Sequence, residues 1–253
     1  MTRRYLRTSD ISKAVGVHPN TVRLYEVWGF LPPIPRSASG YRLFTEAHLE
    51  QMRLARLAFQ GAWPGRRIRR SILALVKQAA AGDLAGARAM AGEHLALARA
   101  EGAQAETAAD FLERWAHGQA VEPMLTPLQI GPAARLLDVT PDMLRNWERN
   151  SLIKVPRDPD NGYRLYGTEE IGRLRVIRLL RSAGYSMMAI LRMMLYFDQG
   201  QRDGLRQALD TPRPDEDIIF AADRWLSTLA EAEEQAKNII AQLDKMLRKI
   251  SNY

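Results

Sequence analysis

The sequence predicts a mainly α-helical protein in which one helical module, completed by a small two-stranded β ribbon, occurs twice. Three observations support this: a segment near the N-terminus recurs later in the chain, apolar residues follow helical spacing, and a long apolar seam runs towards the C-terminus. The predicted organisation is a first module at 1–78, a helical connector and linker at 79–125, a second module at 126–211 and a C-terminal helix at 212–253.

The repeat pairs residues 17–43 with residues 139–165, at a spacing of 121–122 residues. The block Gly-Tyr-Arg-Leu that ends the first copy returns unchanged at the end of the second copy. Leu31 matches Leu152 after the loss of one residue from the second copy. The spacing exceeds the period of about 20–50 residues that is typical of solenoid repeats, so it indicates a duplicated domain.

The sequence of each module predicts two short helices joined by a tight turn. The first helices are expected at residues 9–15 and 132–137, and the second helices begin at Pro19 and Pro141. Proline suits the first position of a helix because that position needs no backbone N–H donor. Two short helices separated by a turn of this length form a helix-turn-helix.

A β ribbon, or wing, is predicted after each helix-turn-helix. A proline-rich stretch is followed by a turn at 37–40 or 158–162 and by a returning strand at 41–44 or 163–166. The second turn contains an Asn-Gly pair, which favours a hairpin. Both modules are therefore expected to be winged helix-turn-helix domains. Further helices are expected at 45–60, 64–78, 168–183 and 186–199.

At these residues the chain resembles a known family. Residues 17–26 read Val-His-Pro-Asn-Thr-Val-Arg-Leu-Tyr-Glu, and they are followed by Gly29-Phe30-Leu31 and by Gly40-Tyr41-Arg42. This ordered combination resembles the DNA-binding domain of the MerR family, and residues 139–148 with 161–166 resemble it a second time. The resemblance implies a transcription regulator with two domains that bind double-stranded DNA.

The resemblance also implies that the second helix of each module enters the major groove, while the wing contacts the sugar-phosphate backbone. Arg23 and Arg145 lie on these helices, and an arginine can read guanine through two hydrogen bonds. Tyr25 aligns with an aromatic position that contacts the DNA backbone in the family, and Trp147 takes its place in the second module. The other candidates are His18, Asn20, Thr21, Thr140, Asp142 and Asn146 on the helices, and Arg36, Tyr41, Arg42, Arg157, Tyr163 and Arg164 on the wings.

The distribution of charge supports two DNA-facing modules. The net charge of +7 divides into +10 in the first module, −4 in the connector, +3 in the second module and −2 in the C-terminal helix. Such alternation indicates two anion-facing modules separated by connecting helices. Glu26 and Glu148 are expected to pair with a nearby arginine, because phosphate repels a carboxylate. Since the two recognition helices differ at most candidate positions, we expect the modules to read different half-sites.

Helices are also expected between and after the modules. Residues 83–101 and 104–117 predict two alanine-rich helices separated at Gly102, followed by a linker at 118–127. From about residue 214 to residue 250, apolar positions three and four residues apart form the seam of a coiled coil. The predicted dimerisation residues on this seam are Trp225, Leu229, Ala236, Ile239, Leu243, Met246 and Ile250.

The partner of this seam has two interpretations. Proteins of the MerR family pair a helix in this place with its copy in a second subunit, so the resemblance implies a homodimer. In the rival arrangement, the helices at 83–117 pair with the C-terminal helix inside a single chain. The more regular seam of the C-terminal helix favours pairing between subunits.

Composition and motifs argue against several classes of function. The chain has no cysteine, which excludes disulfides, thiolate metal sites and cysteine nucleophiles. Its four histidines are not clustered with carboxylates, and it has no phosphate-binding glycine loop or serine elbow, so we expect no metal, no cofactor and no enzyme activity. With no signal peptide and no apolar run long enough to span a bilayer, the protein is expected in the cytoplasm with the nucleoid, without a membrane partner.

The resemblance implies promoter binding, distortion of the promoter DNA and RNA polymerase as a further partner. Two alternatives stay open. One is an architectural DNA-bending protein similar to excisionases. The other is a small-molecule-binding regulator in which one helix-turn-helix no longer binds DNA. The retained Arg145, Arg157, Tyr163 and Arg164 argue against this second alternative.

Overall fold

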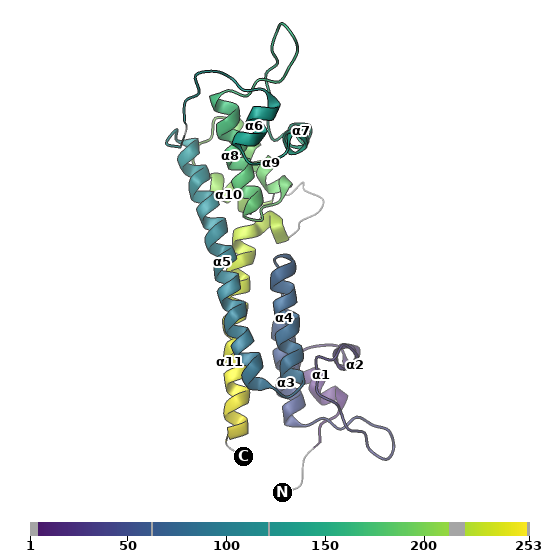
Figure 1. Ribbon diagram of the computed structural model, residues 1–253. Helices are drawn as coiled ribbons and strands as arrows, with labels where there is room; N and C mark the ends of the chain where they lie inside the picture. The colour runs from purple at the N-terminus through teal and green to yellow at the C-terminus, as the bar shows by residue number, and fades with distance from the viewer. Residues whose placement is uncertain (1–4, 62, 121, 213–220, 252–253) are drawn as a thin grey trace. The chain divides into compact units, whose positions relative to one another are not determined.

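A computed structural model describes residues 5–61, 63–120, 122–212 and 221–251 of the chain. The described residues are mainly helical (Figure 1). The helices are α1 (Thr8–Val15), α2 (Pro19–Val27), α3 (Glu46–Ala58), α4 (Gly65–Ala80), α5 (Leu84–Ala116), α6 (Ile130–Leu136), α7 (Pro141–Arg149), α8 (Thr168–Ser182), α9 (Met187–Asp198), α10 (Leu205–Asp210), the 3-10 helix η1 (Ala221–Arg224) and α11 (Trp225–Ser251).

The chain forms two compact units, and both divisions between them fall inside helices. The first unit contains residues 1–100 and 229–253, and the second unit contains residues 101–228. The helices α5 and α11 therefore each contribute to both units. The four consecutive segments predicted from the sequence are thus distributed over two units. We term α1–α4 the first head and α6–α10 the second head.

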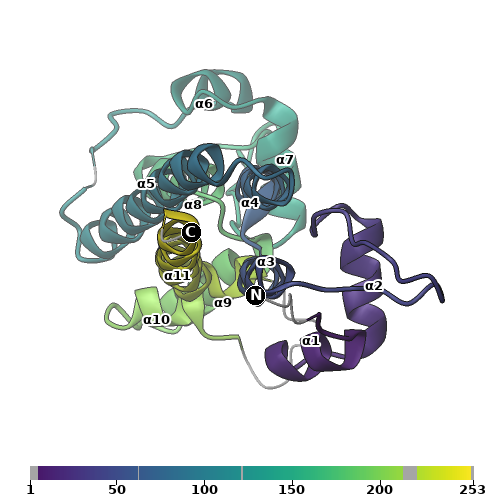
Figure 2. The same cartoon turned by 90° about the horizontal axis from the view of Figure 1, so that it is seen from below.

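The core of the first unit is built from the first head and from parts of both long helices. Leu84, Ala87 and Ala91 of α5 share one buried cluster with Ile239 and Leu243 of α11 and with side chains of α1–α4. The first half of α5 runs beside the second half of α11 (Figures 1 and 2). The C-terminal helix is therefore a core element of the unit that holds the N-terminal head.

The second unit packs the second head around the second half of α5 and the start of α11. The indole N–H of Trp225 donates to the carbonyl of Ala183 over 2.7 Å. The buried guanidinium of Arg192 on α9 donates to the carbonyls of Ala208, Leu209 and Asp223. One arginine thereby satisfies backbone acceptors at the end of α10 and in η1, which would otherwise be costly to bury.

The predicted two-stranded wings are wrong. The described residues contain no β-strand, and the two sides of each loop, 32–44 and 154–166, are joined by a single isolated bridge, Arg36 with Arg42 and Arg157 with Arg164. Phe44 and Tyr166 at the loop ends form further isolated bridges with Leu6 and Leu128. Prolines interrupt the first segment of each loop, and proline cannot donate a ladder hydrogen bond. We term these segments the first loop and the second loop.

Three further predictions are corrected. The connector is one continuous helix, α5, because Gly102 costs only about 1 kcal/mol inside a helix whose neighbouring alanines are buried. The short helix α10 has no counterpart in the prediction. The last helix begins at Trp225 instead of near residue 214, and residues 213–220 lie outside the described residues.

Candidate nucleic-acid interface

A tight turn joins two short helices in both heads. In the first head Gly16 takes a φ of 65°, and in the second head Asp138 takes a φ of 51°. After the second helix, Gly29 and Ser151 also have positive φ values, 73° and 60°. Since these turns coincide, Gly29 is equivalent to Ser151, and the residue missing from the second copy lies in the loop and not before Leu152.

The second helix of each head starts as its sequence predicts. Pro19 and Pro141 occupy the first helical position of α2 and α7. His18 caps α2 with its Nδ1, which accepts a backbone N–H over 3.2 Å. Thr140 caps α7 with its hydroxyl, which accepts a backbone N–H over 3.2 Å. The predicted helix-turn-helix is confirmed in both heads, and these two cap side chains serve the helix itself.

The recognition helix α2 presents an exposed face with one arginine. Asn20, Arg23, Leu24 and Val27 are exposed, while Thr21 is half-buried. Arg23 donates to the Oδ1 of Asn20 over 3.2 Å. Because Asn20 is neutral, this contact does not offset the positive charge of the guanidinium.

The recognition helix α7 repeats this arrangement with a different partner. Asp142, Arg145 and Asn146 are exposed. Arg145 donates to the Oδ1 of Asp142 over 2.6 Å, in the position of the Arg23–Asn20 contact. The side chain of Asn146 accepts from Asn150 over 3.3 Å. In the second head the arginine is therefore already paired with a carboxylate.

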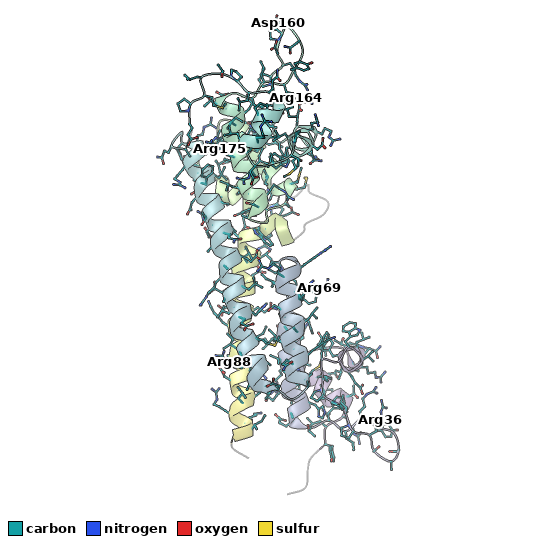
Figure 3. All side chains as sticks on the ribbon, in the orientation of Figure 1. Arg36, Arg69, Arg88, Asp160, Arg164 and Arg175 are labelled. Carbon is teal, nitrogen blue, oxygen red and sulfur yellow. The ribbon has the colours of Figure 1, made fainter. Side chains whose placement is uncertain are left out.

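A glutamate of each recognition helix fixes an arginine of the loop that follows it. In the first head the Nε of Arg42 donates to Glu26 over 2.6 Å, and a nitrogen of Arg36 lies 4.0 Å from the same carboxylate. The expected pairing of this glutamate with an arginine is confirmed. Figure 3 shows Arg36 on the first loop.

The second head repeats the pairing. The Nε of Arg164 donates to Glu148 over 2.6 Å, and Arg157 donates to the other oxygen over 3.0 Å. The tyrosines of the two loops, Tyr41 and Tyr163, are 75% and 61% exposed. Each loop thus carries two arginines and one exposed aromatic ring, all of them predicted as DNA contacts (Figure 3).

Tyr25 and Trp147 do not share the exposed faces of α2 and α7 on which Arg23 and Arg145 lie. They are 6% and 3% exposed, because the helical period places them on the core face of α2 and α7. Tyr25 packs edge-on against Phe30 and Phe59, with ring centroids 5.7 and 5.5 Å apart, and burial raises the pKa of its phenol. The structure therefore makes both rings core residues, and their predicted contact with the DNA backbone stays a prediction.

Sequence reasoning missed a cluster of exposed arginines at the start of α4. Arg66, Arg67, Arg69 and Arg70 are exposed, and the guanidinium of Arg69 lies 5.0 Å from the ring centroid of Trp63 (Figure 3). In the part of the chain that the structure describes, no carboxylate forms an ion pair with Arg66, Arg69 or Arg70. The signal was present in the sequence as the run Arg-Arg-Ile-Arg-Arg.

The predicted dimerisation residues are covered within one chain. Trp225, Leu229, Ala236, Ile239, Leu243 and Met246 are at most 7% exposed, whereas Ile250 is 62% exposed. In the first unit, α5 borders this seam through the ion pairs Arg88–Asp244 at 2.7 Å and Arg99–Glu233 at 3.0 Å (Figure 3 labels Arg88). The seam is thus occupied by the chain's own helices.

The described residues were also compared with the requirements of a metal site, a membrane span and a ligand pocket. They contain no group of three or more histidine, aspartate and glutamate side chains placed to hold a metal ion. Over the same residues, the structure offers no helix with the length and apolar character needed to cross a membrane. A groove of about 610 Å³ in the second unit is lined by Phe111, Arg114 and Leu179 among others, and its polar lining side chains are exposed.

The two heads, each with an exposed arginine on its second helix and an arginine-bearing loop, define a helix-turn-helix protein. Comparison with known families narrows this class. The family model of the MerR HTH family regulatory proteins matches residues 6–63 and 128–196, half of the chain, and the chain belongs to this family. No solved structure gives a significant match.

Three curated proteins illustrate the similarity. The HTH-type transcriptional regulator ZntR of Escherichia coli K12 is 32% identical over 66 residues, which cover 26% of this chain and 47% of ZntR. The transcriptional regulator BrlR of Pseudomonas aeruginosa is 31% identical over 127 residues, 50% of this chain and 42% of BrlR. The regulator CueR of Escherichia coli O6:H1 is 38% identical over 55 residues, 22% of this chain and 41% of CueR. The chain spans less than half the length of each of these relatives.

Proposed function

We propose that the protein is a sequence-specific transcription regulator that reads double-stranded DNA with α2 and α7. One observation carries the proposal. Both heads expose an arginine on the second helix, and both use a glutamate of that helix to hold a loop arginine at 2.6 Å. The names of the relatives, which are transcriptional regulators, support the same function.

The geometry suits a division of labour on DNA. An α-helix fits the major groove, where Arg23 and Arg145 would meet base edges. The loop residues Arg36, Tyr41, Arg157 and Tyr163 are exposed and would contact phosphates, which fixes the position of the helix. The Glu–Arg pairs neutralise a carboxylate that would otherwise repel the phosphates, and they hold each loop beside its helix.

We further propose that the DNA is a promoter, that binding distorts it, and that RNA polymerase is a partner in this step. Family membership supports this part of the proposal. Binding to chromosomal DNA would keep the protein in the cytoplasm with the nucleoid. The alternative is an architectural protein that bends DNA. This alternative predicts that the protein prefers no particular promoter sequence.

Selection of bound duplexes from a random pool tests the proposal. We expect one enriched motif with two parts. Arg23→Ala and Arg145→Ala should each lower the affinity for that motif about tenfold to a hundredfold, because a well-placed arginine–guanine contact contributes about 1–3 kcal/mol of discrimination. Lys237→Gln, which removes an exposed charge on α11, is the matched control and should change the affinity little. Binding that depends on salt but enriches no motif would contradict sequence-specific reading.

A further inference from the structure

The end of α11 is held in the first unit by a buried carboxylate. Glu50 on α3 is 2% exposed, and it accepts hydrogen bonds from Lys249 over 2.5 Å and from Gln242 over 2.7 Å. The Nζ of Lys245 lies 3.2 Å from the same carboxylate. Burial alone would raise the pKa of Glu50, but the hydrogen bonds from these partners lower it to about 2. The first head thus offers a negative group to a positive helix end.

The end of α5 is held in the second unit by the opposite arrangement of charge. Arg206 on α10 pairs with Glu106 and Asp110, and its Nε lies 3.4 Å from Glu113. Two residues after Glu113, Trp115 stacks on Phe197 of α9, with ring centroids 4.5 Å apart. The second head thus offers a positive group to a negative helix end.

Equivalent positions of α3 and α8 contact the end of a long helix in the two heads. Gln51 donates to the carbonyl of Phe30 over 3.0 Å, and Arg173 donates to the equivalent carbonyl of Leu152 over 2.7 Å. These contacts align α3 with α8, so the residues one position earlier, Glu50 and Gly172, are equivalent. A Cβ atom at Gly172 would lie 2.8 Å from the Nε1 of Trp115. One head therefore has a carboxylate where the other has room for an indole ring.

These differences make the two helix ends non-interchangeable. If the end of α11 docked on a second head, Lys249 would meet the position of Gly172, which offers no carboxylate. If the end of α5 docked on a first head, the indole of Trp115 would meet the buried carboxylate of Glu50. A buried charge that loses its partner costs free energy, and such mismatches are a common basis of partner selection.

A symmetric pair of α11 helices from two copies would create this mismatch. Antiparallel pairing of α11 with its copy would direct the lysine-bearing end of each helix towards the second head of the other copy. It would also remove Ile239 and Leu243 from the core of the first unit, and burying such a side chain contributes about 1.5–3 kcal/mol. Pairing of α11 with α5 avoids both costs.

We infer that a single chain binds DNA without a second copy, and that its ligand is one non-palindromic duplex site with two unlike halves. The second part rests on the proposed function. Each head is completed by the helix that follows the other head, so one chain contains what two identical subunits would otherwise supply. Because α2 and α7 expose different side chains, the two halves of the site differ in sequence.

The first test measures the mass and the connectivity of the free protein. Native mass spectrometry should give one chain of 28.6 kDa over a wide range of concentration. The chain has no cysteine, so Arg88→Cys combined with Asp244→Cys places a defined thiol pair across α5 and α11. A short bismaleimide should link these thiols within one chain. A homodimer by mass, or a covalent dimer after cross-linking, would overturn the inference.

A charge-exchange series controls for variants that fail to fold. Glu50→Lys should lower the melting temperature and weaken the docking of α11. Glu50→Lys combined with Lys245→Glu and Lys249→Glu should restore much of the loss, since the exchanged charges attract each other again. If the triple variant does not melt at a higher temperature than Glu50→Lys, the charges of Glu50, Lys245 and Lys249 do not determine where α11 docks.

The second test counts chains on DNA. The probes are the duplex enriched by selection and two palindromes, each built from one of its halves. We expect one chain per enriched duplex. The affinity for each palindrome should be lower by about tenfold or more, because one head then faces a half-site whose base pairs it does not match. Two chains per duplex would refute the single-chain arrangement while leaving the proposed function intact. Absence of any enriched motif would refute the proposed function, and the mass and cross-linking results would still decide the arrangement.

Discussion

The two heads build the same arrangement of second helix and loop and surround it with different charge. In both, a glutamate of the recognition helix binds a loop arginine at 2.6 Å, and a tyrosine of the loop is exposed. The first head adds the exposed arginines of α4, whereas α9 of the second head begins with Met187 and Met188. The comparison suggests that duplication preserved the contacts that shape the surface, while the strength of its attraction for an anion diverged.

The heads differ most where each receives a long helix. A carboxylate on α3 receives the end of α11, and a glycine on α8 receives an indole of α5. Buried positions of this kind tolerate little change, because each is matched to one incoming side chain. Four variants test how far the heads differ, ordered from the largest expected effect to the smallest.

Glu50→Gln should produce the largest change in stability. The pKa of this carboxyl is about 2 in the folded protein against an ordinary value of 4.5, a difference equivalent to about 3 kcal/mol. A lowered pKa stabilises the folded state above the ordinary value, and this contribution is lost as the pH falls from about 4.5 to about 2.

Urea unfolding at pH 7 and at pH 3 provides the measurement for this variant. The difference in unfolding free energy between the parent protein and Glu50→Gln should reach about 3 kcal/mol at pH 7 and shrink at pH 3. Glu93→Gln, at an exposed position of α5, is the control and should have little effect at either pH. A difference that does not depend on pH would mean that the charge of Glu50 is not what holds α11.

Gly172→Ala should destabilise the second head by about 1–3 kcal/mol, because its Cβ would meet the indole of Trp115 at 2.8 Å. That ring cannot move freely, since it stacks on Phe197. Gly102→Ala is the control, because no atom lies within 4 Å of its added Cβ and the helix should gain up to about 1 kcal/mol. Thermal unfolding of both variants checks the contrast, and equal melting temperatures would contradict the packing argument.

Replacement of Arg69 and Arg70 by glutamine should weaken DNA binding through the first head. Each lost phosphate contact lowers the slope of log affinity against log salt by about 0.9, so the double variant should lose up to about 2. Titrations of the selected duplex at several salt concentrations give this slope. Arg178→Gln and Arg202→Gln together remove the same charge from the second unit and should leave the slope nearly unchanged. Equal slopes for all three proteins would show that the arginine cluster does not contact DNA.

Ser151→Gly should give the smallest effect, a gain in unfolding free energy of about 1 kcal/mol. Ser151 has a φ of 60°, which a residue with a Cβ adopts at a cost, whereas Gly29 fills the equivalent position of the first head. Gly29→Ser should cause a loss of similar size. Chemical unfolding of the two variants measures both changes, and effects of the same sign would contradict the proposed equivalence of the turns.

Local signals predicted the starts of α2 and α7 and the partners of two glutamates well. Proline at the first helical position located the start of α2 and α7 in both heads. The repulsion between carboxylate and phosphate correctly assigned Glu26 and Glu148 to arginine partners. These predictions depend on a few neighbouring residues, so they did not require knowledge of the fold.

Predictions that required a distant partner were less successful. The turn signal at Asn161-Gly162 predicted a hairpin, but the prolines before it leave only one bridge between the two sides. The period of apolar residues correctly indicated that one face of α11 is buried, yet it carries no information about which helix covers that face. Tyr25 is a further example. Its alignment with a family position suggested that it is exposed, whereas its place in the helical period puts it in the core.

The interleaving of the two units has a consequence for synthesis on the ribosome. The first head emerges early, but its core includes Ile239 and Leu243, which are made about 140 residues after the end of α5's first half. At ordinary rates of translation this interval lasts on the order of ten seconds. During it, nascent α3 and α4 lack the apolar contacts that α11 makes in the folded protein. The part of the protein that is translated first is therefore completed last, and a premature stop near the end of the gene would damage the N-terminal head.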